Sequence, residues 1–341
     1  MLRSLLDWFG HEDRHGHDGD GLHHDQHLHA HGVVDPSIAT TARGIWAIKW
    51  SFVILAMTAV LQMVVVLVSG SIALLADTIH NIGDATTAVP LWIAFLLARR
   101  KPTATFTYGY GRFEDLAGIL IVLIILFSAL VAGYEAIDRF IHPQPIRQLL
   151  WVAVAGVIGF LGNEAVAMFR IRVGREINSA ALVADGYHAR TDGLTSLAVV
   201  VGAGGIWLGF PLADPLVGLV ITAVIFAIVW QSARVVLVRM LDGVEPGVVG
   251  EICHAAEHVP RIESISEIKA RWLGHHLHAE AEIVVEETLT VREASLIAER
   301  LRAELFAHLP ALAEARIRFR APMQRADERH RASWKHVVDS T

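Results

Sequence analysis

Six long apolar segments dominate the sequence and restrict what it can fold into. Each is long enough to cross a hydrocarbon layer of roughly 30 Å, which takes about 20 residues in a helix. Charged residues gather near the two ends of the chain and leave its middle almost bare. The sequence therefore predicts six transmembrane helices near residues 44–68, 72–98, 114–138, 148–170, 180–209 and 213–238.

The composition agrees with a membrane domain that carries soluble extensions. Charged residues make up 19% of the 341 residues, whereas a soluble protein carries about 25%. The net charge of −6 argues against a dedicated nucleic-acid-binding protein. Cys253 is the only cysteine, so an intramolecular disulfide and a cysteine-rich zinc site are excluded. The start, "MLRSLLDWFG", is short and amphipathic, and it does not resemble a cleaved signal peptide.

The loops between the predicted spans differ in positive charge. The first–second and fifth–sixth loops carry no Lys or Arg, and the third–fourth loop has only Arg139 and Arg147. The second–third loop and the fourth–fifth loop region are richer in positive residues, with Arg99, Arg100, Lys101 and Arg112 in the former and Arg170, Arg172 and Arg175 in the latter. Positive residues favour the cytoplasmic side. We therefore expect both termini in the cytoplasm.

The last third of the chain has a different pattern. "GVVGEICHAAEHV" predicts a helix, "SISEIKARWL" and "HLHAEAEIVVE" predict strands, "VREASLIAERLRAELFAHL" predicts an amphipathic helix, and "ARIRFR" predicts a short strand. The order α-β-β-α-β is typical of a small α+β domain of ferredoxin-like type. We expect a His-rich, mostly disordered arm (1–43), a six-span domain (44–242), a cytoplasmic ferredoxin-like domain (243–322) and a disordered tail (323–341).

Two of the apolar segments share an unusual motif. "SIALLADTIHNIGDATT" (71–87) and "SAALVADGYHARTDGLT" (179–195) have Ser, Ala, Leu, Ala, Asp, His, Asp and Thr at the same relative positions. An ionisable group at membrane depth costs at least about 2.5–3.5 kcal/mol on insertion scales. A helix His can simply be packed, and an intramembrane Asp can pair with a Lys. The duplication is hard to explain by packing and indicates a shared chemical role.

The spacing within the motif predicts a metal site. His80 and Asp84 are four residues apart, as are His188 and Asp192, so each pair lies on one helix face. If the second and fifth spans pack together, two nitrogens and two oxygens converge. That tetrahedral set suits Zn²⁺, and Co²⁺ or Cd²⁺ would also fit.

A second carboxylate precedes each histidine of the motif by three residues. Asp77 and Asp185 therefore lie on nearly the same helix faces as the predicted ligands. We interpret them as groups that orient an imidazole or line the way in for the metal. Carboxylates placed at helix ends are the alternative interpretation.

The paired motifs resemble a known family. "ALLADTIHNIGD" and "NSAALVADGYHARTDGLTS", with "YGYGRFEDLAG" and "LADPLVGLVITAVI" at matching places, resemble the cation diffusion facilitators over about residues 44–322. The resemblance implies a homodimeric six-span exporter in the bilayer of a bacterial inner membrane, which exchanges a divalent metal for protons. It also implies a carrier rather than an enzyme, with no organic cofactor. The ligands carried over are His80, Asp84, His188 and Asp192.

The His-x-x-x-Asp pattern in both spans is similar to the zinc branch of that family. Zn²⁺ is therefore the expected cargo, with Cd²⁺ and Co²⁺ next. An exporter preferring Co²⁺/Ni²⁺ or Fe²⁺/Mn²⁺ is one alternative, and a membrane metal sensor without transport is another. An intramembrane zinc protease would need a His-Glu-x-x-His motif, which the sequence lacks.

The sequence departs from the family pattern in two places. "FTYGYGR" has Tyr110 where relatives with a further loop site have a histidine. The positions that match a histidine-bound zinc pair in the cytoplasmic domain of several relatives are Ser266, Glu282, Ser295 and Phe319. Other histidines could form a cytoplasmic metal site instead: His254, His258, His275, His276 and His278. A polar strand face is the alternative interpretation of the last three.

The amino-terminal arm contains "HEDRHGHDGDGLHHDQHLHAHG". Its histidines are His11, His15, His17, His23, His24, His27, His29 and His31. We interpret the arm as a metal-collecting segment, since tethering raises the local ligand concentration to roughly millimolar. A solvated tail without a metal role is the alternative.

Overall fold

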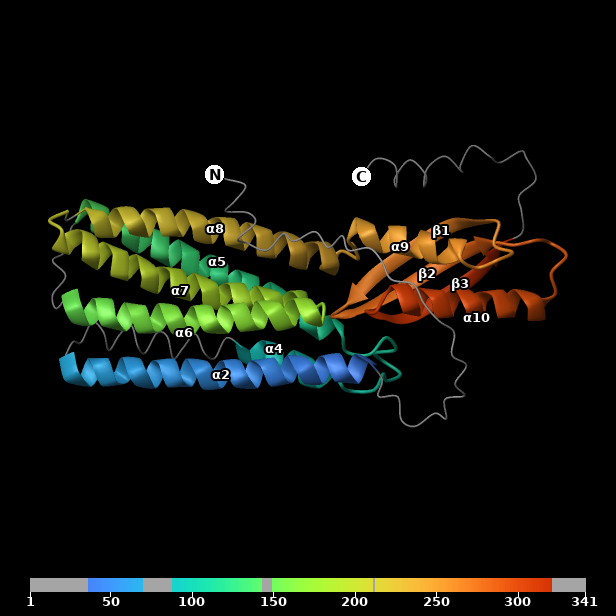
Figure 1. Ribbon diagram of the computed structural model, residues 1–341, viewed down its shortest axis with the longest axis horizontal. Helices are drawn as coiled ribbons and strands as arrows, with labels where there is room; N and C mark the ends of the chain where they lie inside the picture. Colours follow the sequence, from blue (N-terminus) through green and yellow to red (C-terminus); the bar gives the residue numbers. More distant parts are fainter. Residues whose placement is uncertain (1–35, 70–87, 143–148, 211, 321–341) are drawn as a thin grey trace, which may run out of the picture. The chain divides into compact units, whose positions relative to one another are not determined.

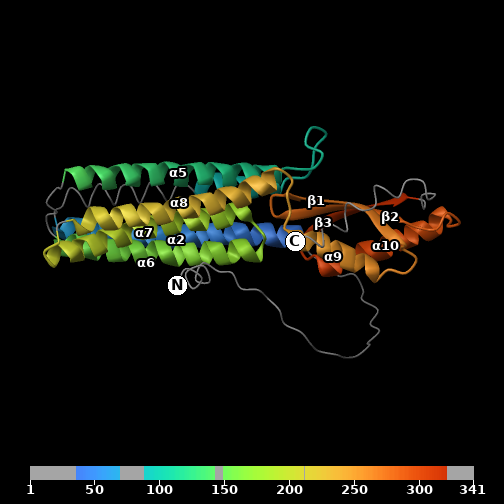
Figure 2. The same ribbon diagram turned by 90° about the horizontal axis from the view of Figure 1, so that it is seen from above.

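The computed structural model describes residues 36–69, 88–142, 149–210 and 212–320. In this part of the chain the helical region consists of α2 (Pro36–Ser69), α4 (Ala88–Ala98), α5 (Arg112–Ile141), α6 (Leu149–Glu176), α7 (Ala180–Trp207) and α8 (Ala213–Met240). These helices run alongside one another in both ribbon views (Figures 1 and 2). They agree with the predicted spans, except that most of the second span precedes α4 and lies outside the described residues.

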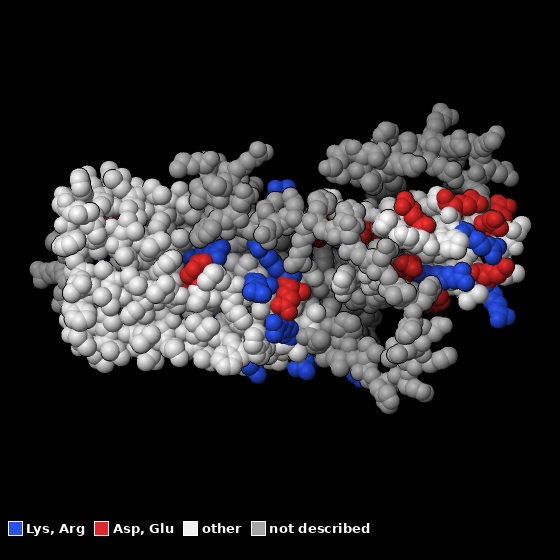
Figure 3. All heavy atoms as spheres, viewed as in Figure 1, with Lys and Arg blue, Asp and Glu red and all other residues white. Residues whose placement is uncertain are grey.

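Four of the described helices are long and apolar enough to cross a membrane: Thr40–Ser69, Arg112–Ile141, Leu149–Glu176 and Ala213–Met240. Large apolar side chains such as Phe127 and Trp230 are exposed on them, as expected for helices whose outer faces meet lipid. On the face drawn in Figure 3, the helical region carries few charged residues, and those gather toward the α+β domain. The described region is therefore that of a multi-pass membrane protein.

Helix α7 is as long as its neighbours but is missing from that group of four. It carries Asp185, Arg190 and Asp192 near its start, which lowers its hydropathy. It packs against α4, α5, α6 and α8, so these polar side chains face protein rather than lipid. An intramembrane charge is tolerated where it faces the bundle interior.

The carboxyl-terminal domain consists of α9 (Pro246–Glu257), β1 (Ser264–Leu273), β2 (His276–Val284), α10 (Val291–His308) and β3 (Leu312–Arg320). Strand β2 pairs antiparallel with β1 and parallel with β3. Alternate residues of β2, from Leu277 to Ile283, are buried, and α9 and α10 cover that face of the sheet (Figure 2). The predicted α-β-β-α-β order is confirmed.

Candidate metal centre

Helix α7 begins at a tight connection from α6. Asn178 has a left-handed backbone with φ of 58°, and Ser179 accepts a hydrogen bond from the backbone N–H of Leu182 at 3.1 Å. A serine in extended conformation is a favoured N-cap because it satisfies one unpaired N–H of the first turn. The short connection makes α6 and α7 antiparallel neighbours and fixes the position of the motif along α7.

His188 and Asp192 lie one turn apart on α7, as the spacing predicts. Their exposed fractions are only 1% and 9%, and His188 Nδ1 lies 3.9 Å from Asp192 Oδ2. The hydroxyl of Thr191 donates to the His188 carbonyl at 2.7 Å, and that of Thr195 donates to the Asp192 carbonyl at 2.8 Å. The neighbouring hydroxyls are thus used within the helix, and the imidazole and carboxylate share one buried face.

The other half of the predicted site lies outside the described residues. This applies to His80, to Asp84 and to Asp77, as well as to the histidines of the amino-terminal arm. The structure therefore positions two members of the predicted quartet, and the complete four-ligand site stays a prediction.

Asp185 pairs with a residue that the sequence analysis assigned to a loop. Its Oδ2 lies 3.0 Å from Nη1 of Arg170 on α6, and the side chains are 0% and 2% exposed. Gly186 allows this approach, because a Cβ there would lie 2.7 Å from a side-chain carbon of Ile171. The sequence analysis gave pairing with a Lys as an ordinary explanation of an intramembrane Asp, and in the structure the basic partner of Asp185 is Arg170. The proposed role in orienting His188 stays a prediction.

A second ion pair joins the same two helices. Arg190 on α7 binds Glu164 on α6 through two contacts, Nη2 to Oε1 at 2.6 Å and Nε to Oε2 at 3.2 Å. This fork geometry is the most directional that an Arg–carboxylate pair can adopt. Ion pairs therefore fasten α6 to α7 at residues on both sides of His188.

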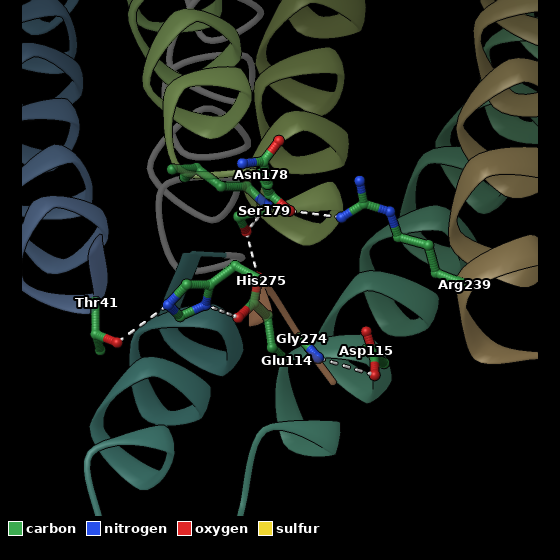
Figure 4. A network of polar contacts seen from close by, with 9 residues as sticks. Thr41, Glu114, Asp115, Asn178, Ser179, Arg239, Gly274 and His275 are labelled. Atoms are coloured by element: carbon green, nitrogen blue, oxygen red, sulfur yellow. Dashed lines mark hydrogen bonds and ion pairs between the residues drawn. The ribbon is translucent and has the colours of Figure 1, made fainter. Parts of the chain in front are cut away.

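A buried polar network meets the start of α7 (Figure 4). Glu114 on α5 accepts a hydrogen bond from the Ser179 hydroxyl at 2.5 Å, and its other oxygen lies 2.6 Å from His275 Nδ1. The second ring nitrogen of His275 lies 3.1 Å from the Thr41 hydroxyl of α2. The network thus connects α2, α5 and the start of α7 with the β1–β2 turn of the carboxyl-terminal domain.

The turn that carries His275 depends on a glycine. Gly274 has φ of +62°, and a Cβ at this position would lie 2.7 Å from a carboxylate oxygen of Glu114. Its N–H donates to Asp115 Oδ2 at 3.3 Å. Glu114 and Asp115 stand in the stretch "YGYGRFEDLAG", and the sequence analysis assigned these two carboxylates no role. Two adjacent carboxylates at the start of an apolar span were the signal for this network.

The end of α8 joins the same region. Arg239 donates to the Asn178 carbonyl at 2.5 Å and contacts Glu245 at 3.1 Å, and its guanidinium lies 4.3 Å from the Trp272 ring centroid. Arg112 at the start of α5 pairs with Asp242 just after α8. These contacts add to the connection between the membrane helices and the carboxyl-terminal domain.

The five histidines suggested for a cytoplasmic metal site do not come together. His275 takes part in the network, with the His276 ring 4.0 Å from its own. His278 lies 3.2 Å from Glu314; burial lowers the pKa of His278, and Glu314 opposes that shift. His254 and His258 form a separate group, with ring centroids 4.6 Å apart.

Both parts of the chain match domains of known proteins. Residues 48–241 match the cation efflux transmembrane domain, and residues 244–318 match the cytoplasmic domain of cation efflux proteins. The probable cation efflux system protein Rv2025c of Mycobacterium tuberculosis is 52% identical over 292 residues, which cover 85% of this chain and 88% of that protein.

Two further matches are more distant. A "Cadmium, cobalt and zinc/H(+)-K(+) antiporter" of Bacillus velezensis is 26% identical, over 75% of this chain and 82% of that protein. The solved structure titled "MamM-CTD 215-293" is 26% identical, covers 22% of this chain and 96% of its own length, and gives a TM-score of 0.22.

A multi-pass helical domain followed by this α+β domain defines a cation efflux carrier rather than an enzyme. The chain belongs to the cation diffusion facilitator family.

Proposed function

We propose that this protein exports Zn²⁺, and also Cd²⁺ or Co²⁺, in exchange for protons. The site would consist of the paired motifs of the second and fifth spans, with His80, Asp84, His188 and Asp192 as ligands. The observation that carries the proposal is the buried pair of His188 and Asp192 on one face of α7. A relative named for cadmium, cobalt and zinc supports the choice of metals.

Proton exchange would follow from the ligand chemistry. Metal binding needs a neutral imidazole and an ionised carboxylate, so metal and protons compete for the same atoms. An ordinary imidazole titrates near pH 6.5. The affinity for metal should therefore fall as the pH drops through that range. A site that opens toward the more acidic side would take up protons and release its metal, and alternating access of the spans would couple the two fluxes.

The proposal also covers the oligomeric state, the membrane topology and the amino-terminal arm. We infer a homodimer in a bacterial inner membrane, with both termini in the cytoplasm, because the carboxyl-terminal domain is of the cation efflux type and positive residues cluster in the even-numbered loops. The His-rich arm would collect metal near the cytoplasmic entrance. The four segments 1–43, 44–242, 243–322 and 323–341 would act as arm, carrier, cytoplasmic domain and tail.

Flux into sealed vesicles tests the proposal. The purified protein is reconstituted, the membrane potential is clamped, and uptake of Zn²⁺, Cd²⁺, Co²⁺, Ni²⁺, Mn²⁺ and Fe²⁺ is measured with and without a pH gradient. We expect Zn²⁺ flux to rise when the side receiving the metal is more acidic, and a protonophore to abolish the gain. Flux that ignores the gradient would contradict proton exchange. Bound metal without any flux would indicate a sensor.

A further inference from the structure

Three histidines meet where two helices of the carboxyl-terminal domain end. His254 is in the last turn of α9, His258 is its C-cap, and His308 is the last residue of α10. The ring centroids of His254 and His258 are 4.6 Å apart, and those from His308 to the other two are 5.6 Å and 5.4 Å. One ring nitrogen of each lies within 4.8 Å of the others.

The spacing is close to that of a metal site. Zinc–nitrogen bonds of about 2.0–2.1 Å place tetrahedral ligand atoms about 3.4 Å apart. The nitrogens therefore need to move together by about 1.4 Å at most. His254 and His258 are exposed, and His308 is partly so, which lets their rings turn without disturbing the core. The two helices that hold them pack together on the sheet, so the backbone spacing is fixed.

The ends of the two helices favour a bound cation, and a hydrogen bond already orients the imidazole of His308. The carboxyl ends of both helices carry partial negative charge, which attracts cations. Nδ1 of His308 donates to the Glu304 carbonyl at 2.9 Å, which leaves Nε2 as the acceptor for a metal. The Glu257 carboxylate lies 3.5 Å from His254 Nδ1.

We propose that His254, His258 and His308 form a binding site for a divalent transition metal of the zinc type, with a fourth position open to water. Imidazole suits Zn²⁺, Cu²⁺ and Ni²⁺, and an open, exposed site would exchange its metal with solution. The site is distinct from the membrane quartet. It also differs from the family's cytoplasmic zinc pair, whose matching residues here are Ser266, Glu282, Ser295 and Phe319.

Residue-resolved chemical footprinting tests the site in the full-length protein. Diethyl pyrocarbonate modifies accessible imidazoles, and peptide mass spectrometry reports each histidine separately from those of the arm and the membrane site. With Zn²⁺ as the probe, we expect the three histidines to become protected together. His142 is the internal control, because its side chain is 72% exposed at the end of α5, and it should stay reactive at every Zn²⁺ concentration.

The His308→Ala variant should raise the Zn²⁺ concentration for half-protection of His254 and His258 by at least about tenfold, since loss of even a supporting group costs that much in metal affinity. His254→Ala, at an exposed position, should do the same for His308, and His142→Ala should change nothing. Equal reactivity with and without Zn²⁺, or protection that survives His308→Ala, would overturn the site. Asp192→Asn should leave the protection intact even if it abolishes flux, which separates this proposal from the transport mechanism.

Discussion

Two histidines of this protein are almost equally buried and yet differ in their surroundings. His188 on α7 is 1% exposed, and His275 in the β1–β2 turn is 2% exposed. Both nitrogens of His275 lie within hydrogen-bond distance of protein groups, 2.6 Å from Glu114 and 3.1 Å from Thr41. Nδ1 of His188 lies 3.9 Å from Asp192, which is too far for a hydrogen bond.

The difference teaches that partner geometry, and not burial, separates a structural histidine from a candidate ligand. Two metal–ligand bonds of about 2.0–2.2 Å join a nitrogen and an oxygen that are about 3.4–4.2 Å apart, depending on the angle between the bonds. The 3.9 Å between the two atoms on α7 falls in that interval, as the proposed metal site requires. The contact of His275 with Glu114 is too short for an inserted ion, and it fastens the turn to α5.

The largest effect is expected from a substitution in the His188–Asp192 pair on α7. Asp192→Asn removes the negative charge of a proposed ligand while keeping its shape, so Zn²⁺ flux into vesicles should fall by at least about a hundredfold. Asp138→Asn is the matched control, since Asp138 is half-exposed at the end of α5 and the substitution should leave flux unchanged. Near-normal flux in Asp192→Asn would refute the four-ligand site.

The next effect distinguishes two roles for Asp185. Asp185→Asn leaves the buried Arg170 without its partner, and breaking such a pair costs about 3–5 kcal/mol. We expect that loss in the free energy of unfolding, measured by denaturation in mixed detergent micelles. The double variant Asp185→Asn with Arg170→Gln should recover part of the loss. Unchanged stability with reduced flux would show instead that Asp185 acts on His188.

A smaller effect is expected from a substitution in the hydrogen-bond network around His275. Glu114→Gln replaces one carboxylate oxygen by an amide N–H₂ facing either Ser179 or His275, and a buried group left unsatisfied costs about 1–3 kcal/mol. Amide hydrogen exchange should become faster at the turn around Gly274. Glu135→Gln, with a largely exposed side chain on the same helix, is the control. Exchange that matches the control would mean that the network contributes nothing to holding the turn.

The smallest effect concerns histidines outside both buried centres. Deleting residues 11–32 removes eight histidines and should leave the maximal flux nearly unchanged. The Zn²⁺ concentration for half-maximal flux should rise, because the arm no longer raises the local metal concentration to roughly millimolar. Loss of transport at saturating Zn²⁺ would show that the arm is part of the mechanism and not only a collector.

Local pattern was enough to predict much of this protein. The length of the apolar segments predicted the spans that the structure describes, because the thickness of a bilayer sets the length of a spanning helix. Alternation and helical periodicity predicted the order of elements in the α+β domain. The four-residue spacing put His188 and Asp192 on one face of α7, since that relation is a property of any helix.

Tertiary structure decided the contacts between residues that are distant in sequence. The sequence analysis assigned Arg170 to a loop region. In the structure α6 and α7 pack closely at Gly186, and this packing buries Arg170 against Asp185. Glu114 and His275 are 161 positions apart, and His308 joins His254 only because α9 and α10 end together. Periodicity assigns a side chain to a face of its own helix or strand, but only the packing of several elements determines which faces meet.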